Sequence, residues 1–259
     1  MILKGKTAFI SGSSSGIGFG IAECMAQAGA KIFLHGIEDV AVLESRARQI
    51  REKHSAEVKV FSVNLGDPKA VLDFCGQSVF SEIDILVNNA GIQHVSPIET
   101  FPLEKWNLVL QLHLSTPFLL MRQILPKMRE RGWGRVISVA SVHGQVASQQ
   151  KAAYVSAKHG VIGLTKVAAL ETAGSGITVN AICPGWVRTA LVEAQIATKA
   201  KEKNISVEAA ARELLAEKQP SLKFTEPSDI GAMAVFLCST AGNNLTGQSL
   251  TIDGGWTAQ

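Results

Sequence analysis

A tyrosine and a lysine four residues apart are the residues best suited to chemistry. Tyr154 is the single tyrosine of the chain, and Lys158 follows it by about one helical turn. This spacing puts both side chains on one face of a helix, where an ammonium favours the phenolate and lowers the pKa of the phenol. Such a phenol can exchange a proton with an alcohol or a ketone. Ser141, thirteen residues upstream, can hydrogen-bond the same substrate oxygen.

The Tyr-x-x-x-Lys spacing alone is common and usually structural, so its interpretation depends on a second motif. Gly12, Gly16 and Gly18 form the pattern Gly-x-x-x-Gly-x-Gly between a predicted strand and a predicted helix. Glycines let the backbone turn tightly and approach a pyrophosphate, and the free N–H groups at a helix start attract phosphates. The alternative is a glycine-rich turn with no ligand. Together, the two motifs predict a catalytic site beside a bound dinucleotide.

The residues after the second predicted strand favour NAD over NADP as the cofactor. The strand ends at His35-Gly36-Ile37 without a basic residue, and no lysine or arginine lies in the glycine-rich turn. A basic residue in this region accommodates the 2′-phosphate of NADP. The acidic pair Glu38-Asp39 follows at once and would repel that phosphate.

Short apolar strands alternate with helices along the chain and would position these motifs. We expect strands at residues 7–11, 31–35, 58–63, 83–88, 135–138, 178–183 and 249–253, and helices at residues 16–27, 39–53, 67–80, 115–131, 154–173 and 229–239. Continuous apolar strands indicate a sheet buried on both faces, and the alternation indicates right-handed βαβ units. The predicted fold class is therefore α/β, a three-layer doubly wound parallel sheet of the Rossmann type, in a single domain over residues 1–259.

Residues 189–219 interrupt the alternation, because they are helical in pattern but precede no strand. Ligands bind outside the carboxyl ends of parallel strands. We therefore predict that this segment is a helical substrate lid. Its lysines and glutamates have a simpler interpretation as a solvated helix face.

Composition excludes several other classes of protein. Hydrophobic residues make up 46% and charged residues 18% of the 259 residues, which excludes a disordered chain. The formal charge of +3 is small, and the basic residues are scattered along the sequence. We therefore expect no nucleic acid as a partner. No apolar run approaches the roughly 18 residues of a membrane span, and the start lacks a secretory signal. The four cysteines form no C-x-x-C pair, so we expect reduced thiols, no metal site and a cytoplasmic location.

Taken together, these motifs resemble the short-chain dehydrogenase/reductase family over the whole chain. The matching pieces are Gly12-x-x-x-Gly16-x-Gly18, Asn88-Asn89-Ala90-Gly91, Ser141, Tyr154-x-x-x-Lys158 and Pro184-Gly185. The resemblance implies the strand order 3-2-1-4-5-6-7, commonly a homotetramer, and hydride transfer at a nicotinamide. Tyr154 would be the acid/base, Ser141 would orient the substrate carbonyl, and Lys158 would hold the nicotinamide ribose.

The resemblance also implies where the cofactor lies. Asn89 would lie near its adenosine side and the Pro184-Gly185 loop against the nicotinamide. The predicted cofactor contacts are Gly12, Ser14, Ser15, Gly16, Ile17, Gly18, Gly36, Asn64, Leu65, Asn89, Ala90, Gly91, Tyr154, Lys158, Pro184, Gly185, Val187 and Thr189.

Two positions depart from the family's pattern. His113 stands where the family usually has an asparagine that helps hold the lysine through water. Histidine can donate and accept hydrogen bonds, so a catalytic relay through His113 and a buried structural histidine both remain open. Asn64 stands where the family often has an aspartate that binds adenine. An asparagine keeps both a donor and an acceptor at that position.

Several longer stretches resemble one member group, the bacterial D-3-hydroxybutyrate dehydrogenases. They are residues 88–94, 143–144, 151–154, 182–189, 217–222 and 253–257. This resemblance implies NAD-dependent, reversible oxidation of (R)-3-hydroxybutyrate to acetoacetate. The substrate contacts that we predict are Gln93, Ser141, His143, Lys151, Tyr154, Trp186, Gln195 and Trp256.

A small hydroxy acid needs hydrogen-bond donors for its carboxylate near the reacting carbon. Lys151 can supply a cation, and Gln93 and His143 follow the ends of predicted strands, although each of the three can also be an ordinary surface residue. By resemblance, Gln195 would close over the carboxylate from the lid. Trp186 and Trp256 can wall the methyl side of a four-carbon substrate; for Trp256 the alternative is packing against a neighbouring subunit.

Two other functions remain open. One is an NADPH-dependent reductase of a ketoacyl or sugar carbonyl, which the missing cationic site near the glycine-rich turn disfavours. The other is a non-catalytic nucleotide-binding protein, which the intact set of Ser141, Tyr154 and Lys158 disfavours. The expected partner is a small hydroxy acid or keto acid, with neither nucleic acid nor membrane.

Overall fold

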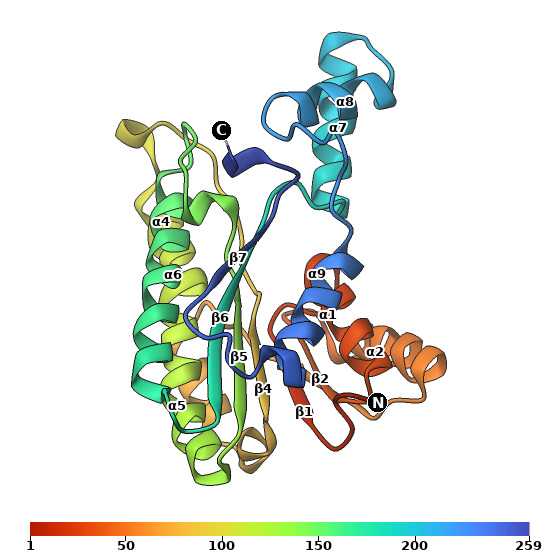
Figure 1. Ribbon diagram of the computed structural model, residues 1–259. Helices are drawn as coiled ribbons and strands as arrows, with labels where there is room; N and C mark the ends of the chain where they lie inside the picture. Colours follow the sequence, from red (N-terminus) through yellow and green to blue (C-terminus); the bar gives the residue numbers. More distant parts are fainter. Residues whose placement is uncertain (259) are drawn as a thin grey trace.

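Seven parallel strands form one sheet in the computed structural model, which describes residues 1–258 (Figure 1). The strand order is β3-β2-β1-β4-β5-β6-β7, as expected from the sequence. The strands are β1 (Thr7–Ile10), β2 (Lys31–Gly36), β3 (Val58–Ser62), β4 (Ile85–Asn88), β5 (Gly134–Val139), β6 (Ile177–Pro184) and β7 (Ser249–Ile252). The order reverses between β1 and β4, and in such sheets a crevice for ligands opens at the carboxyl ends of the strands at this point.

Helices cover both faces of the sheet and complete three layers (Figure 1). One layer holds α1 (Gly16–Gln27), α2 (Val40–His54) and α9 (Pro227–Cys238). The other holds α3 (Pro68–Cys75), α4 (Leu103–Leu110), α5 (Thr116–Arg131) and α6 (Ala152–Thr172). This arrangement confirms the predicted fold class.

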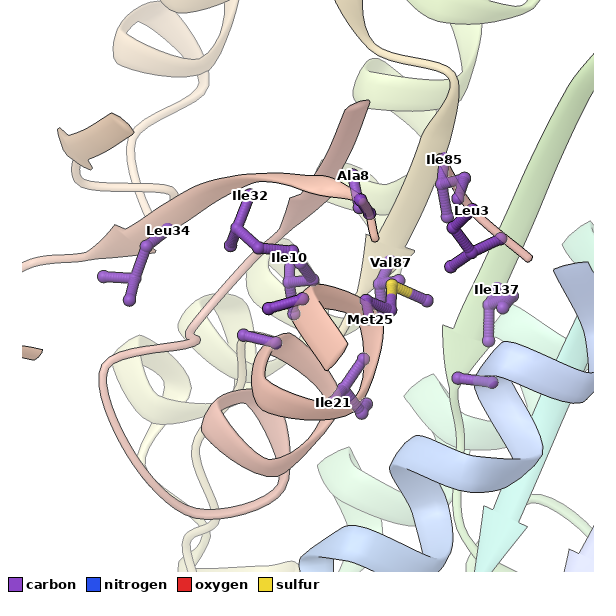
Figure 2. Close-up of a cluster of buried hydrophobic side chains, with 14 of the residues drawn as sticks. Leu3, Ala8, Ile10, Ile21, Met25, Ile32, Leu34, Ile85, Val87 and Ile137 are labelled. Atoms are coloured by element: carbon purple, nitrogen blue, oxygen red, sulfur yellow. The ribbon is translucent and has the colours of Figure 1, made fainter. Parts of the chain in front are cut away.

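Apolar side chains fill the space on both faces of the sheet. Successive side chains of a strand point to opposite faces, and β1 shows this directly. Ala8 and Ile10 pack toward Ile21 and Met25 of α1 (Figure 2), whereas Phe9 packs into the cluster on the opposite face. The central strands β1, β4, β5 and β6 are buried on both sides, and their sequences are mostly apolar rather than alternating. The edge strands β3 and β7 are only partly buried.

The helix before β5 is longer than predicted. It was expected over residues 115–131, but helical structure begins at Leu103. The residues between α4 and α5, Gln111–Ser115, form a π-helical turn in which the N–H of Thr116 donates to the carbonyl of Gln111, five residues back. A proline is common at the first position of a helix, so Pro117 is compatible with a helix that starts nearby. In the structure, helical residues continue through this proline from the preceding turn. The predicted helix over 67–80 is also wrong in length, since α3 ends at Cys75 and a 3-10 turn spans Ser78–Glu82.

The continuous helical stretch Leu103–Arg131 is long and apolar enough to cross a membrane by length and composition. In this fold, Leu120, Ile124 and Met128 of α5 are fully buried in the cluster that faces the sheet. The apolar face of the stretch is therefore used for packing within the protein.

The α7–α8 pair, made of α7 (Ala190–Lys203) and α8 (Val207–Ala216), projects beyond the sheet at the top of the view in Figure 1. The two helices pack on each other through a small cluster of their own that includes Ile196, Ala200 and Ala210. Two lysines of α7 form ion pairs with glutamates of the second helix and its end. Lys203 pairs with Glu213 within α8, and Lys199 pairs with Glu217, which follows α8. The charges therefore join the two elements, in addition to facing solvent.

Candidate active site

The glycine-rich turn joins β1 to α1 and has little room for side chains. Gly12 and Gly16 have φ angles of +63° and +55°, which other residues rarely adopt. A Cβ atom at Gly12 would lie 2.9 Å from the Cα of Ala90. A Cβ atom at Gly18 would lie 2.2 Å from the carbonyl oxygen of Gly12. Gly18 therefore lets α1 pack against the turn, and it does not itself line the cavity described below.

Two polar side chains fix the shape of this turn. The N–H of Gly12 donates to Nδ1 of His35 (2.9 Å), so Nε2 of His35 carries the proton and donates to the carbonyl of Val63 (3.0 Å). Asn89 donates from Nδ2 to the carbonyls of Ser11 and Gly12 (2.9 and 3.0 Å). Burial lowers the pKa of His35 to about 4, so the imidazole is neutral at physiological pH. The sequence did not indicate this role of His35, although its place at the end of β2 beside the turn is the available signal.

A cavity of about 490 Å³ opens at the carboxyl ends of the strands. Its wall contains every predicted cofactor contact except Gly18 and Asn64, and every predicted substrate contact. Asn64 lies in an exposed turn, where its Oδ1 accepts a hydrogen bond from the N–H of Gly66 (3.0 Å). The wall also contains His35 and Glu38, which were not among the predicted contacts. Residues far apart in the sequence therefore meet at the predicted edge of the sheet.

The three predicted catalytic side chains face this cavity from two elements. Ser141 follows β5 and caps a short 3-10 turn, where its Oγ accepts from the N–H of His143 (3.2 Å). Tyr154 and Lys158 come from the first half of α6, and the Lys158 ammonium lies 5.4 Å from the centre of the phenol ring. Lys158 is buried, and its Nζ donates to the carbonyl of Val139 (2.6 Å).

The protonation of this group differs from the sequence-based expectation. Lys158 was expected to lower the pKa of Tyr154, but removal from water raises that pKa, and hydrogen bonding with Ser141 offsets only part of the effect. Burial also lowers the pKa of Lys158 to about 7. Because a desolvated ammonium readily loses its proton, Lys158 supplies less positive charge than its type alone suggests. Both shifts therefore act against the charged form of each group when the cavity contains no further charge.

His113 lies in the π-helical turn and contacts the catalytic tyrosine. Its Nε2 is 2.8 Å from the carbonyl oxygen and 3.1 Å from the nitrogen of Ile92, and its ring meets the ring of Tyr154 edge-on at 5.2 Å. A Cβ atom at Gly91 would overlap the imidazole. Burial, and then the nearby charge of Lys158, lower the pKa of His113 to about 3. His113 therefore contacts both the segment after β4 and the ring of Tyr154.

The buried histidines predict a loss of stability in acid. His35 and His113 have folded-state pKa values of about 4 and about 3, below the ordinary value of 6.5. As the pH falls below 6.5 the unfolded chain takes up protons first, so the free energy of unfolding falls until the folded-state pKa is reached, by about 1.4 kcal/mol per pH unit for each histidine. Melting temperatures between pH 7 and pH 4 measure this slope.

His113→Asn keeps a hydrogen-bonding side chain but removes the titration, so its slope should be shallower than that of the wild type. His159→Asn, on the exposed side of α6, is the matched control and should keep the wild-type slope. Equal slopes for wild type and His113→Asn would contradict the prediction.

The remaining polar and aromatic residues form the substrate end of the cavity. The ring of His143 packs edge-on against Tyr154 (5.9 Å) and Trp256 (5.4 Å), and Trp256 packs against Trp186 (6.0 Å). Nε2 of His143 is 2.8 Å from Oγ of Ser148, a contact that the sequence did not indicate. Trp256 therefore reaches the site of its own chain, in line with the first of its two interpretations.

Lys151 supplies the cation of this end of the cavity. Its Nζ lies 5.9 Å from the ring centre of Trp186, and burial lowers its pKa. Within residues 1–258 no carboxylate forms an ion pair with it, so its charge is available to a ligand. Gln93 and Gln195 line the same cavity, Gln195 from α7. No group of three or more histidine, cysteine, aspartate or glutamate side chains in the described part of the chain is placed to hold a metal ion.

The residues present fit a nicotinamide dinucleotide. The cavity is continuous from the glycine-rich turn to Tyr154. Ser15 does not cap α1 with its side chain, so the first N–H groups of the helix remain free for phosphate oxygens. At the adenosine end, Oε2 of Glu38 is buried without a hydrogen-bond partner among the described residues. Such an orphaned acceptor suits a ribose hydroxyl.

Known proteins match this chain along its full length. Residues 12–257 match the family model described as Enoyl-(Acyl carrier protein) reductase. D-beta-hydroxybutyrate dehydrogenase of Cupriavidus necator is 48% identical over all of both chains, and that of Rhizobium meliloti is 43% identical over 98% of this chain and 99% of its own. The structure of L-sorbose reductase from Gluconobacter frateurii with NADPH and L-sorbose has a TM-score of 0.93, 32% identity, and coverage of 99% of this chain and 98% of its own. With the fold and the grouping of Ser141, Tyr154 and Lys158 described above, these matches establish that the chain belongs to the short-chain dehydrogenase/reductase family.

Proposed function

We propose that the protein catalyses the NAD-dependent, reversible oxidation of (R)-3-hydroxybutyrate to acetoacetate. The observation that carries this proposal is the cation of Lys151, which pairs with no carboxylate within residues 1–258 and lines the same cavity as Tyr154, Gln93 and His143. A cation and neutral donors suit a carboxylate close to the reacting carbon. The aromatic wall of Trp186 and Trp256 leaves space for a short alkyl group. The relatives named D-beta-hydroxybutyrate dehydrogenase support the same substrate.

In this reaction the residues of the chain move a proton and hold the substrate. Tyr154 takes the proton of the 3-hydroxyl group, and Ser141 hydrogen-bonds the same oxygen and fixes its orientation. Lys158 would hold the nicotinamide ribose and, when charged, support the phenolate. A nicotinamide bound there would supply the acceptor for the hydride that leaves carbon 3. Because oxidation releases a proton through Tyr154, alkaline pH favours oxidation and acid pH favours reduction.

The substrate carboxylate is held at the substrate end of the cavity, close to the reacting carbon. Lys151 supplies charge and Gln93 donates a hydrogen bond. Burial lowers the pKa of His143 to about 4, so its ring is neutral, and its two nitrogens lie against Oγ of Ser141 (3.4 Å) and Oγ of Ser148 (2.8 Å) beside the substrate. Gln195 of α7 lies in the cavity wall and completes the enclosure when the α7–α8 pair closes as a lid. Closure would exclude water and strengthen each of these interactions.

The preference for NAD rests on Glu38. Its Oε1 accepts from Oγ of Ser14 (2.7 Å), and a Cβ atom at Gly36 would lie 2.1 Å from Oε2, so only glycine leaves room for this carboxylate. Burial opposes ionisation of Glu38, but the hydrogen bonds from Ser14 and from backbone N–H groups outweigh it and lower the pKa. An ionised carboxylate accepts a ribose 2′-hydroxyl and repels a 2′-phosphate.

Glu38→Gln should therefore weaken the discrimination between the two cofactors. We expect the ratio of kcat/KM for NAD to that for NADP to fall by roughly 100-fold, because one like-charge contact costs several kcal/mol. Steady-state kinetics with each cofactor measure the ratio. Asp39→Asn is the matched control: Asp39 is exposed next to Glu38 and lies outside the cavity wall, so its ratio should stay that of the wild type. If the kcat/KM ratio fell equally in both variants, the cofactor preference would come from the overall negative charge of this region and not from Glu38.

The main test of the proposed function follows the absorbance of NADH with purified protein and (R)-3-hydroxybutyrate, with the (S) enantiomer as the control. The second candidate is a sugar reductase, which the similarity to the NADPH-bound L-sorbose reductase favours. Turnover of L-sorbose with NADPH, without turnover of (R)-3-hydroxybutyrate with NAD, would overturn the first candidate.

We also propose a homotetramer in the cytoplasm. Exposed apolar side chains of α5 and α6, among them Phe118, Val167 and Leu170, favour contact with further copies of the chain. The four cysteines within the described residues are free thiols, as in a reducing compartment. A particle mass near that of one chain, measured by light scattering, would contradict the assembly.

A further inference from the structure

One buried glutamine outside the cavity wall connects several segments around the site. Gln219 follows α8, is 1% exposed and does not line the cavity. We propose that Gln219 is a positioning residue that clamps the base of the lid and thereby fixes the aromatic wall of the substrate site. The functional part of this proposal rests on the proposed hydroxy acid substrate.

The side chain of Gln219 bonds both ends of the chain excursion that contains α7 and α8. Its Oε1 accepts from the N–H of Trp186 (3.0 Å), and its Nε2 donates to the carbonyl of Lys223. Next to it, the two ends pair directly: the N–H of Thr225 donates to the carbonyl of Trp186 (3.0 Å), and the N–H of Arg188 donates to the carbonyl of Thr225 (2.9 Å). Gln219 therefore lies where the chain leaves the sheet toward the lid and returns from it.

Gln219 also packs against the turn that carries Trp256. A Cβ atom at Gly254 would lie 2.7 Å from Cγ of Gln219, and one at Gly185 would lie 2.7 Å from its Oε1. These glycines let the two loops close onto the glutamine from opposite sides. Since Trp186 and Trp256 follow these glycines and pack on each other at 6.0 Å, Gln219 sets the relative position of both rings.

This placement separates Gln219 from the groups that move the proton. Ser141 lies after β5, and Tyr154 and Lys158 lie on α6. None of them hydrogen-bonds Gln219 within the described chain. A change at Gln219 should thus alter how tightly the substrate is held, while the titrations that govern proton transfer stay as they are.

Gln219→Met keeps the length of the side chain but leaves the Trp186 N–H and the Lys223 carbonyl without their partner. We expect KM for (R)-3-hydroxybutyrate to rise on the order of 100-fold, the loss that follows a displacement of about 1 Å in a binding group. The Kd of NADH, measured by its fluorescence, should rise much less than KM, because the glycine-rich turn and Glu38 lie in the cavity wall far from Gln219. The pH profile of kcat should stay that of the wild type. Gln248→Met is the matched control. The exposed side chain of Gln248 donates only to the carbonyl of Thr246 within the described residues, so this substitution should leave KM unchanged.

Gln219→Glu distinguishes positioning from a general structural role. Burial raises the pKa of a carboxyl group, and the protonated form can accept from Trp186 and donate to Lys223 as the glutamine does. The ionised form would place negative charge against the Lys223 carbonyl. KM of Gln219→Glu should therefore be close to that of the wild type at low pH and rise with pH relative to it, whereas KM of Gln219→Met should be raised at every pH.

An unchanged KM in Gln219→Met, or equal losses in KM and in NADH binding, would overturn the proposal. So would a KM of Gln219→Glu that keeps a constant ratio to the wild type across the pH range. Quenching of tryptophan emission by acrylamide gives a readout that does not depend on the substrate: greater quenching in Gln219→Met, reversed at low pH in Gln219→Glu, supports the clamp. If the wild type fails to oxidise (R)-3-hydroxybutyrate, the proposed function falls, and the emission readout alone decides the clamp, with unchanged quenching overturning it.

Discussion

Tyr154→Phe is expected to lower kcat on the order of 1,000-fold, within the range that general acid–base catalysis contributes. The substitution removes the phenol oxygen and keeps the ring that packs against His113 and His143. No other tyrosine exists in the chain to replace it. The expected loss therefore lies in the proton transfer, and stopped or steady-state assays of NADH formation measure it.

The control for Tyr154→Phe is cofactor binding. The glycine-rich turn, Asn89 and Glu38 do not contact the phenol oxygen, so the Kd of NADH should change little. More than a tenth of the wild-type kcat in Tyr154→Phe would contradict the assigned role. Because the chain has one tyrosine, titration of phenolate absorbance reports Tyr154 alone, and its midpoint in the free protein should lie above the ordinary tyrosine pKa.

Lys151→Met is expected to raise KM for (R)-3-hydroxybutyrate by roughly 100-fold, as when one partner of a desolvated ion pair is removed. The methionine keeps the apolar stem beside Trp186 and removes the charge. The measurement compares KM for the hydroxy acid with KM for butan-2-ol, which has a secondary hydroxyl and no carboxylate.

The comparison of substrates tests whether Lys151 binds the carboxylate. KM for butan-2-ol should be the same in wild type and Lys151→Met, and Lys151→Arg should recover part of the binding of the hydroxy acid. Equal losses for both substrates would instead indicate that Lys151 supports the start of α6, where it stands at the N-cap position.

Local patterns in the sequence predict most of this site. The glycine-rich turn and the pairing of Tyr154 with Lys158 depend on short spacings, and the α/β class depends on alternation, all of which are visible in one dimension. The strand order, in contrast, follows only from the resemblance to a known family. Contacts between distant segments are not visible in this way. His35 accepts from Gly12 and Gln219 accepts from Trp186. For His35 the place at the end of β2 is the one signal, and the residues around Gln219 give none.

Two further differences between the expectations from the sequence and the structure have physical causes. The π-helical turn at Gln111–Ser115 depends on a hydrogen bond one residue longer than that of an α-helix, and no hydrophobic period marks it. The pKa of Tyr154 was predicted from its charged neighbour alone. Its direction is set by desolvation, which depends on the residues of other elements packed around Tyr154 rather than on the residue four positions away.

The bridge between Val187 and Thr225 has a consequence for how such enzymes diverge. The excursion that carries α7 and α8 starts and ends at one point of the scaffold, and its helices have an apolar cluster of their own. The entropy of closing a loop grows only with the logarithm of its length. Changes in the length of α7 and α8 should therefore be tolerated by the sheet, provided that the residues at the base of the excursion are kept. Evolution or design could then vary this helical pair and leave the rest of the fold untouched.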